Sequence, residues 1–241
     1  MSTWWVTSTL DSPNGPILLI SWVVWVIGSI VLHELGHGWA ALSCGDDTPR
    51  LSGHMTWNPL VHMGWMSLIV FALLGIAWGA MPVNPSRFRG RYDDMIVALA
   101  GPMMNVALAL ACIIGCALWI PLATGAWFGS AVPSTLGYNL EMFLRVGAML
   151  NVTLALFNLL PVPPLDGSRV LMAFFPGVAR ALMGTELGRL ALVIVFVLVF
   201  TGGSGLVFSL AARASNRAIE SALRLTMPGS TSSPAFSPAV P

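Results

Sequence analysis

Long apolar runs separated by short polar segments dominate this chain. A helix needs ~20 apolar residues to cross the ~30 Å hydrocarbon core of a bilayer. The pattern predicts spanning helices over residues 16–43, 94–121 and 141–160, and a last, glycine-interrupted span over 187–212. We therefore predict an all-α polytopic membrane protein with about four to six transmembrane helices.

The segments between these runs are shorter and less regular. Residues 50–59 alternate loosely between apolar and polar side chains, which predicts a short membrane-associated β-hairpin strand. Residues 63–81 are apolar but short for a span and rich in glycine, so we expect a re-entrant or interfacial element. Residues 170–183 form another short apolar piece, predicted to be interfacial.

The composition agrees with a membrane protein. The 241 residues are 56% hydrophobic and 9% charged, with a mean hydropathy of +0.80. A net charge of +1 argues against nucleic acid as a partner. The three cysteines cannot form a disulfide framework. Residues 1–16 contain no Lys or Arg, so we expect no cleaved signal peptide.

One apolar run contains ionisable residues that a membrane helix normally excludes. His33, Glu34 and His37 form the pattern H-E-x-x-H within residues 16–43. Residues four apart lie on one face of a helix, so both imidazoles can bind one metal ion, with Glu34 beside them to accept a proton from water. Chance gives this pattern on the order of once per thousand such chains. The alternative is a pair of buried histidines that hydrogen-bond to backbone carbonyls.

A catalytic zinc site needs a third protein ligand. Asp166 is the strongest candidate, because it follows an apolar run that ends at Pro161, Pro163 and Pro164. Such irregular backbone is tolerated at membrane depth only where it is buried in protein or lines a water-filled cavity. The alternative for Asp166 is an ordinary turn residue. Other acidic candidates are Glu141, Glu186 and Glu220.

Three sequence elements together resemble the site-2 protease family of intramembrane zinc metalloproteases. They are H-E-L-G-H at 33–37, A-G-P-M-M-N at 100–105 and N-L-L-P-V-P-P-L-D-G at 158–167. The segment P-V-N-P at 82–85 is also similar to the compact bacterial and archaeal members, and the likeness covers about residues 27–171. We therefore expect the compact prokaryotic type, without a PDZ or a CBS domain.

The resemblance implies a fold with three core helices that carry these elements in order. This catalytic core would occupy about residues 16–171 of an intramembrane metalloprotease domain over residues 1–226. The segment 227–241 is rich in proline and serine, and we predict a disordered tail there.

The resemblance also implies the chemistry of the site. One zinc ion (Zn²⁺) per chain would be bound by His33, His37 and Asp166, and Glu34 would be the general base for peptide-bond hydrolysis. The implied substrate is a membrane protein, cleaved in or near a transmembrane helix: a single-pass helix or a signal-peptide remnant.

Further residues would contact this substrate. The resemblance implies that Asn158 orients the substrate or stabilises the oxyanion, and that Asn105 and Pro164 line the substrate cleft. A helix must unwind before its carbonyls can be attacked. The strand-like residues 51–57 could hold the unwound chain by edge pairing.

The metal site also predicts a topology, because its ligands must lie at one depth. The first and third predicted spans then run in the same direction, and the second runs oppositely. The positive-inside rule places Arg87, Arg89 and Arg91 in the cytoplasm. We therefore expect a plasma-membrane protein with its active site toward the cytoplasmic leaflet. A single last span would leave three C-terminal arginines outside, against this rule.

Two other functions stay open. One is a membrane zinc protease that cuts extramembrane segments, with a downstream glutamate as third ligand. The other is a metal transporter or a non-catalytic metal-binding scaffold, for which Glu34 would be dispensable. A site that only holds a metal needs no base beside its ligands, which favours an enzyme. The sequence leaves the substrate's identity, the trigger for cleavage and the oligomeric state undetermined.

Overall fold

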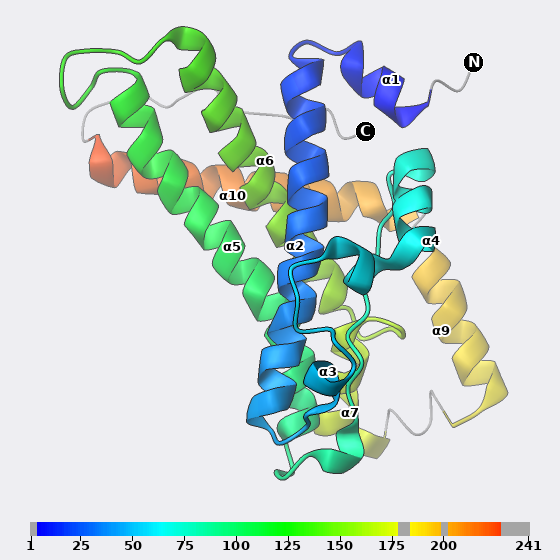
Figure 1. Ribbon diagram of the computed structural model, residues 1–241. Helices are drawn as coiled ribbons and strands as arrows, with labels where there is room; N and C mark the ends of the chain where they lie inside the picture. The colour runs from blue at the N-terminus through cyan, green and yellow to red at the C-terminus, as the bar shows by residue number, and fades with distance from the viewer. Residues whose placement is uncertain (1–3, 178–183, 199–201, 228–241) are drawn as a thin grey trace.

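The computed structural model describes residues 4–177, 184–198 and 202–227 (Figure 1). Within these ranges every regular element is a helix, which confirms the predicted all-α class. In chain order they are α1 (Trp5–Leu10), α2 (Gly15–Ser43), α3 (Thr48–Leu51), α4 (Pro59–Leu74), the 3₁₀ helix η1 (Pro85–Arg87), α5 (Asp93–Ala123), α6 (Ser134–Asn158), α7 (Asp166–Phe174), α9 (Glu186–Leu198) and α10 (Ser204–Thr226). Residues 178–183 of the predicted interfacial piece and 228–241 of the predicted tail lie outside the described residues.

Three of the described helices are long and apolar enough to cross a membrane. They are α2, α5 and α6, with 29, 31 and 25 residues, and they form the three-helix core expected from the sequence. The bounds of α2 and α5 agree closely with prediction. Helix α6 begins at Ser134 rather than at residue 141, directly after Pro133, which caps it with a non-helical conformation.

The three long helices pack closely against one another. Leu18, Trp22, Val26 and Ile30 repeat every fourth residue of α2 and form one buried stripe, in a core cluster that α4, α6 and α10 complete. Lipid tails are as apolar as these side chains, so close packing must stabilise the bundle. A Cβ atom at Gly36 would lie 2.9 Å from the carbonyl oxygen of Ala100, so a small residue is what lets α2 approach α5.

The β-strand predicted within residues 50–59 is wrong. The chain instead forms α3 and a series of turns. The buried carboxylate of Asp46 accepts hydrogen bonds from the backbone N–H groups of Thr48 and Asn84, at 3.0 and 2.6 Å. The bond to Thr48 is local and favours a helical turn, as does Pro49 in the first turn of α3. The bond to Asn84 fixes this turn against the segment just before η1.

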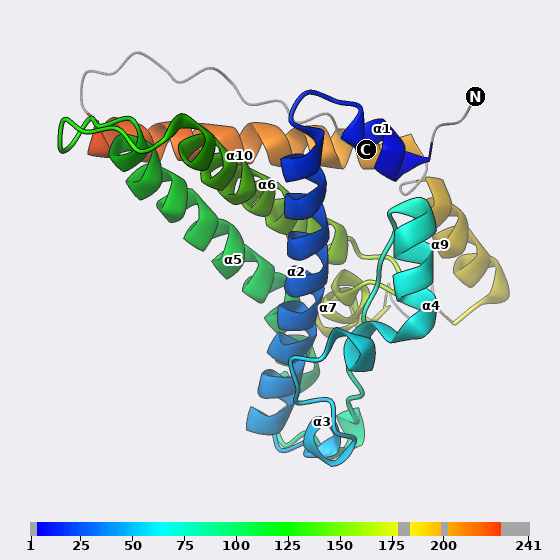
Figure 2. The ribbon, with the colours of Figure 1, turned by 45° about the horizontal axis from the view of Figure 1, so that its top comes forward.

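The re-entrant path predicted for residues 63–81 is found. Helix α4 breaks at Gly64, which has φ 66° and ψ 173°, and ends at Gly75 in the left-handed region. The chain then doubles back along α4, and Ala80 N–H donates to the carbonyl of His62 at 2.9 Å. Figures 1 and 2 show it returning toward η1 and the start of α5, so the segment leaves from and returns to the same end of α2.

The predicted last span over residues 187–212 is divided into two helices. Helix α9 has 13 residues, or about 20 Å at 1.5 Å per residue, which is short for a span. Helix α10 takes a different direction and lies across α5 and α6 (Figure 2). Its buried side consists of Ala211, Ser215, Ile219 and Leu223. The expected four to six spans therefore reduce to three among the described helices.

Candidate metal centre

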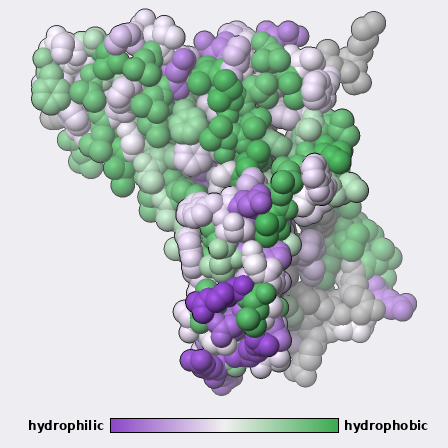
Figure 3. All heavy atoms as spheres, in the orientation of Figure 1, coloured by the Kyte–Doolittle hydropathy of each residue, from purple (hydrophilic) through white to green (hydrophobic). Residues whose placement is uncertain are grey.

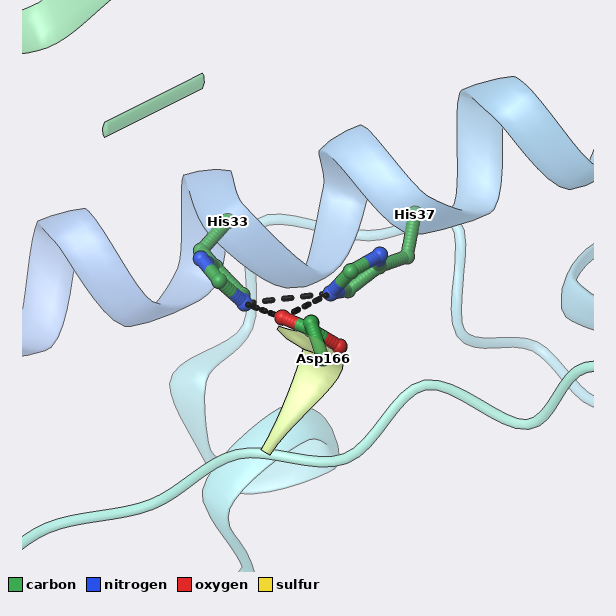
Figure 4. A group of neighbouring side chains, drawn as sticks. All are labelled: His33, His37 and Asp166. Carbon is green, nitrogen blue, oxygen red and sulfur yellow. Dashed lines mark hydrogen bonds and ion pairs between the residues drawn. The ribbon is translucent and has the colours of Figure 1, made fainter. Parts of the chain in front are cut away.

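The H-E-x-x-H motif of α2 and the first residue of α7 meet in space (Figure 4). The Nε2 atoms of His33 and His37 lie 3.0 Å apart. Asp166 Oδ2 lies 3.2 Å from the first and 3.3 Å from the second. Among the described residues, this is the one group of three histidine, cysteine or acidic side chains arranged to share a metal ion. Glu141, an alternative third ligand, instead pairs with Arg145 at 2.8 Å.

Asp166 reaches the histidines because the chain turns sharply after α6. Helix α6 ends at Asn158, and backbone hydrogen bonds from Val162 to Leu160 and from Leu165 to Val162 close the turn. A Cβ atom at Gly167 would overlap the carbonyl oxygen of Leu159, so only glycine lets α7 start this close to the end of α6. The Asp-Gly pair therefore has a steric explanation.

Outer hydrogen bonds fix the protonation pattern of both histidines. His37 Nδ1 lies 2.6 Å from the carbonyl oxygen of Val97, and His33 Nδ1 lies 2.6 Å from Oδ1 of Asn105. Both partners accept, so each Nδ1 donates and each Nε2 presents a lone pair. Both lone pairs point at Asp166 Oδ2, which is buried and has no hydrogen-bond donor among the described residues. Three electron-rich atoms this close need a cation between them, so the residues fit zinc.

Gly101 of α5 packs directly against the two metal-facing nitrogens. A Cβ atom there would overlap Nε2 of His37 and lie 2.5 Å from Nε2 of His33. We expect Gly101→Ala to displace an imidazole and weaken zinc binding about 10–100-fold, measured by competition with a chelator. Gly28→Ala is the control, because no described residue outside its own helix backbone and chain neighbours lies within 4 Å of a Cβ at that position of α2. Equal zinc affinity in the two variants would contradict the expected steric role.

Glu34 lies buried beside the histidines under the chain that returns from α4. A Cβ atom at Gly79 would lie 2.6 Å from Glu34 Oε1 and 2.8 Å from Ile30 Cγ2. Ser67 Oγ donates to the carbonyl of Trp78 at 2.7 Å and anchors this part of the returning chain. The re-entrant segment therefore covers the carboxylate expected to act as the base.

The three residues predicted to contact the substrate, Asn158, Pro164 and Asn105, differ in how far they are exposed. Asn158 is half-buried at the end of α6 and donates to its own helix at Leu154. Pro164 is exposed in the turn that leads to Asp166. Asn105 has no exposed surface and contacts His33, so it does not line an open cleft.

Sequence reasoning missed two residues around the histidines. Gly101 belongs to the quoted A-G-P-M-M-N element, but its contact with both imidazoles needs the packed helices. Asn151 is fully buried and hydrogen-bonds to Asn105 at 3.0 Å. Its amide in an apolar run was a usable signal, since a polar side chain at that depth requires a partner.

This bundle, with its metal-binding group inside a long apolar helix, has the architecture of a membrane-embedded metallopeptidase. Peptidase family M50, which contains the site-2 proteases, matches residues 21–202, and the chain belongs to this family. It is a zinc metalloprotease.

Curated relatives agree with this assignment. The chain is 34% identical to YwhC of Bacillus subtilis over 73% of its own length and 79% of that protein. It is 30% identical to Rip2 of Mycolicibacterium smegmatis, over 80% and 73% of the two chains. It is 31% identical to MJ0611 of Methanocaldococcus jannaschii, over 66% and 73%. Each of these proteins is named as a zinc metalloprotease. No solved structure matches the chain.

Proposed function

We propose that this protein hydrolyses a peptide bond in or near the transmembrane helix of a membrane-protein substrate. The observation that carries the proposal is the position of the metal-binding group along α2. His33 lies ten residues before the helix ends at Ser43, or about 15 Å along its axis. That distance is about half of the ~30 Å hydrocarbon core, so the reaction would take place within the bilayer.

In this proposal His33, His37 and Asp166 hold one zinc ion. When bound, zinc supplies a Lewis acid that makes water nucleophilic at neutral pH. Glu34 accepts a proton from the attacking water and delivers it to the leaving amine. The Asn158 amide, at the end of the helix that leads to Asp166, donates to the developing oxyanion or orients the substrate.

The substrate must unwind at the cleaved bond, because a helix hides its carbonyls in its own hydrogen bonds. Residues 51–57 form no strand, so they are not the edge that receives the unwound chain. Residues 76–84 are non-helical and pass over Glu34 at Gly79. We assign the contact with unwound substrate to this segment, and to Pro164 on the α7 side of the site.

For the cell, we propose a multi-pass protein of a prokaryotic plasma membrane, with the site toward the cytoplasmic leaflet. In the space-filling view apolar residues dominate the upper and middle parts, and the largest group of strongly hydrophilic residues lies at the lower end (Figure 3). Arg87, at the end of η1, and Arg89 and Arg91, in the link from η1 to α5, are exposed. The backbone N–H of Arg89 donates to the carbonyl of Cys44 at the C-terminal end of α2, at 3.3 Å. By the positive-inside rule this end faces the cytoplasm.

The test compares two substrates in liposomes that contain the purified protein. One is a single-pass membrane protein trapped in native membranes by the Glu34→Gln variant. The other is a soluble peptide with that protein's extramembrane sequence. We expect cleavage of the membrane substrate at a bond that mass spectrometry places in or next to its apolar segment. Cleavage confined to the soluble peptide would favour the extramembrane protease, and cleavage of neither would favour a non-catalytic metal-binding protein.

A further inference from the structure

We propose that Asn151, in the middle of α6, is a positioning residue that holds His33 in its metal-binding tautomer. The two side chains are joined through Asn105. Asn151 Nδ2 donates to the Gly147 carbonyl at 2.9 Å, and Asn105 Nδ2 donates to Asn151 Oδ1 at 3.0 Å. Asn105 Oδ1 then lies 2.6 Å from His33 Nδ1. The inference rests on the proposed role of His33 as a metal ligand.

The direction of this hydrogen-bonded chain follows from its first member. The Gly147 oxygen can only accept, so the Asn151 amide must turn its nitrogen toward it. Oδ1 of Asn151 then faces Asn105. Because this oxygen accepts, Asn105 must turn its amide nitrogen toward it and donate. Oδ1 of Asn105 is left for His33, and an oxygen can only accept. The proton of the neutral His33 ring is therefore on Nδ1, and Nε2 is free to bind a metal.

Burial prevents these hydrogen bonds from reversing their direction at low cost. Both amides have no exposed surface, so water cannot replace a lost partner. Without the Asn151 oxygen, the Asn105 amide can turn over and present its nitrogen to His33. The imidazole would then carry its proton on Nε2, the atom that faces Asp166, and could not bind zinc there.

His37 does not depend on such a chain. Its Nδ1 donates to the backbone oxygen of Val97, which belongs to α5 and cannot turn over. The two histidines therefore differ in how their tautomers are set: one by a helix backbone, the other by two amide side chains from α5 and α6. This difference predicts which histidine a change at Asn151 will affect.

The experiment measures zinc affinity and the tautomers of the metal-free protein in full-length Asn151→Ala. We expect zinc binding about 10–100-fold weaker than in the unchanged protein, by competition with a chelator. Nitrogen-15 NMR of labelled histidine should show His33 moving to the Nε2–H form while His37 keeps Nδ1–H. The chain has only four histidines, so these signals can be assigned.

Two further variants separate positioning from a general structural effect. Asn151→Asp presents an oxygen to Asn105 in either orientation, so His33 should keep its proton on Nδ1. Its second oxygen faces the Gly147 carbonyl in place of the amide donor, so this variant should be less stable than the unchanged protein. Thr153→Val removes a buried hydroxyl that donates to the carbonyl of Met149 in its own helix, and it should leave zinc affinity unchanged.

Several results would overturn the proposal. The first is unchanged zinc affinity and tautomers in Asn151→Ala. The second is an equal loss of affinity in Thr153→Val. The third is an Nε2–H form of His33 in the unchanged metal-free protein, a measurement that needs no variant to fold. If His33→Ala instead keeps its zinc, the proposed metal site itself fails, which distinguishes the two failures.

Discussion

Glu34→Gln is expected to abolish cleavage of a membrane substrate while the protein stays folded and keeps its zinc. Glutamine has nearly the same shape as glutamate but cannot accept the proton from water. General base catalysis contributes about 10²–10⁴-fold to such reactions, so the rate should fall by at least this amount. The measurement is the cleavage rate in liposomes, together with the zinc content of the purified variant.

A matched control is available in the same chain. Glu186 is exposed at the start of α9, and Glu186→Gln makes the same chemical change outside the metal-binding group. We expect it to cleave normally. Unchanged cleavage in Glu34→Gln would refute the proposed mechanism, and loss of zinc from that variant would mean that Glu34 helps to hold the site together.

Asp166→Ala should lose zinc and activity together. Structural zinc sites bind with about 10–16 kcal/mol, so one of three ligands is worth roughly 4 kcal/mol, or about 10³-fold in affinity. The measurement is zinc content by mass spectrometry after dialysis against a weak chelator. Glu186→Ala, which removes a carboxylate considered as an alternative third ligand, should keep its zinc. If Glu186→Ala loses its zinc and Asp166→Ala keeps it, the third ligand is Glu186 on α9, and the result favours a protease that cuts extramembrane segments.

The fold was predictable where a pattern is local. Helices α2 and α5 follow from uninterrupted apolar runs, and the re-entrant path follows from the shortness and glycines of residues 63–81. The strand at 50–59 was wrong because a loose alternation is a weak signal beside the hydrogen bonds that Asp46 makes. The last span was wrong because its apolar residues are divided between two helices, α9 and α10, that run in different directions.

In the metal-binding group, too, some features follow from local sequence and others depend on how the helices pack. The spacing of His33 and His37 determines that they share a face, since a helix repeats every 3.6 residues wherever it lies. Asp166 could be named beforehand because prolines break the apolar run just ahead of it. Its distance from the histidines, however, depends on how α6 and α7 pack against α2.

Local order along the chain thus accounts for the membrane class, the three long helices and the two histidines on one helical face. It does not account for the short distance between Asp166 and those histidines, the position of the re-entrant segment over Glu34 or the amides that set the His33 tautomer. These features need contacts between helices far apart in sequence. Such contacts depend on close backbone approach at positions such as Gly36 and Gly101, and a hydrophobic pattern does not encode which helix will approach there.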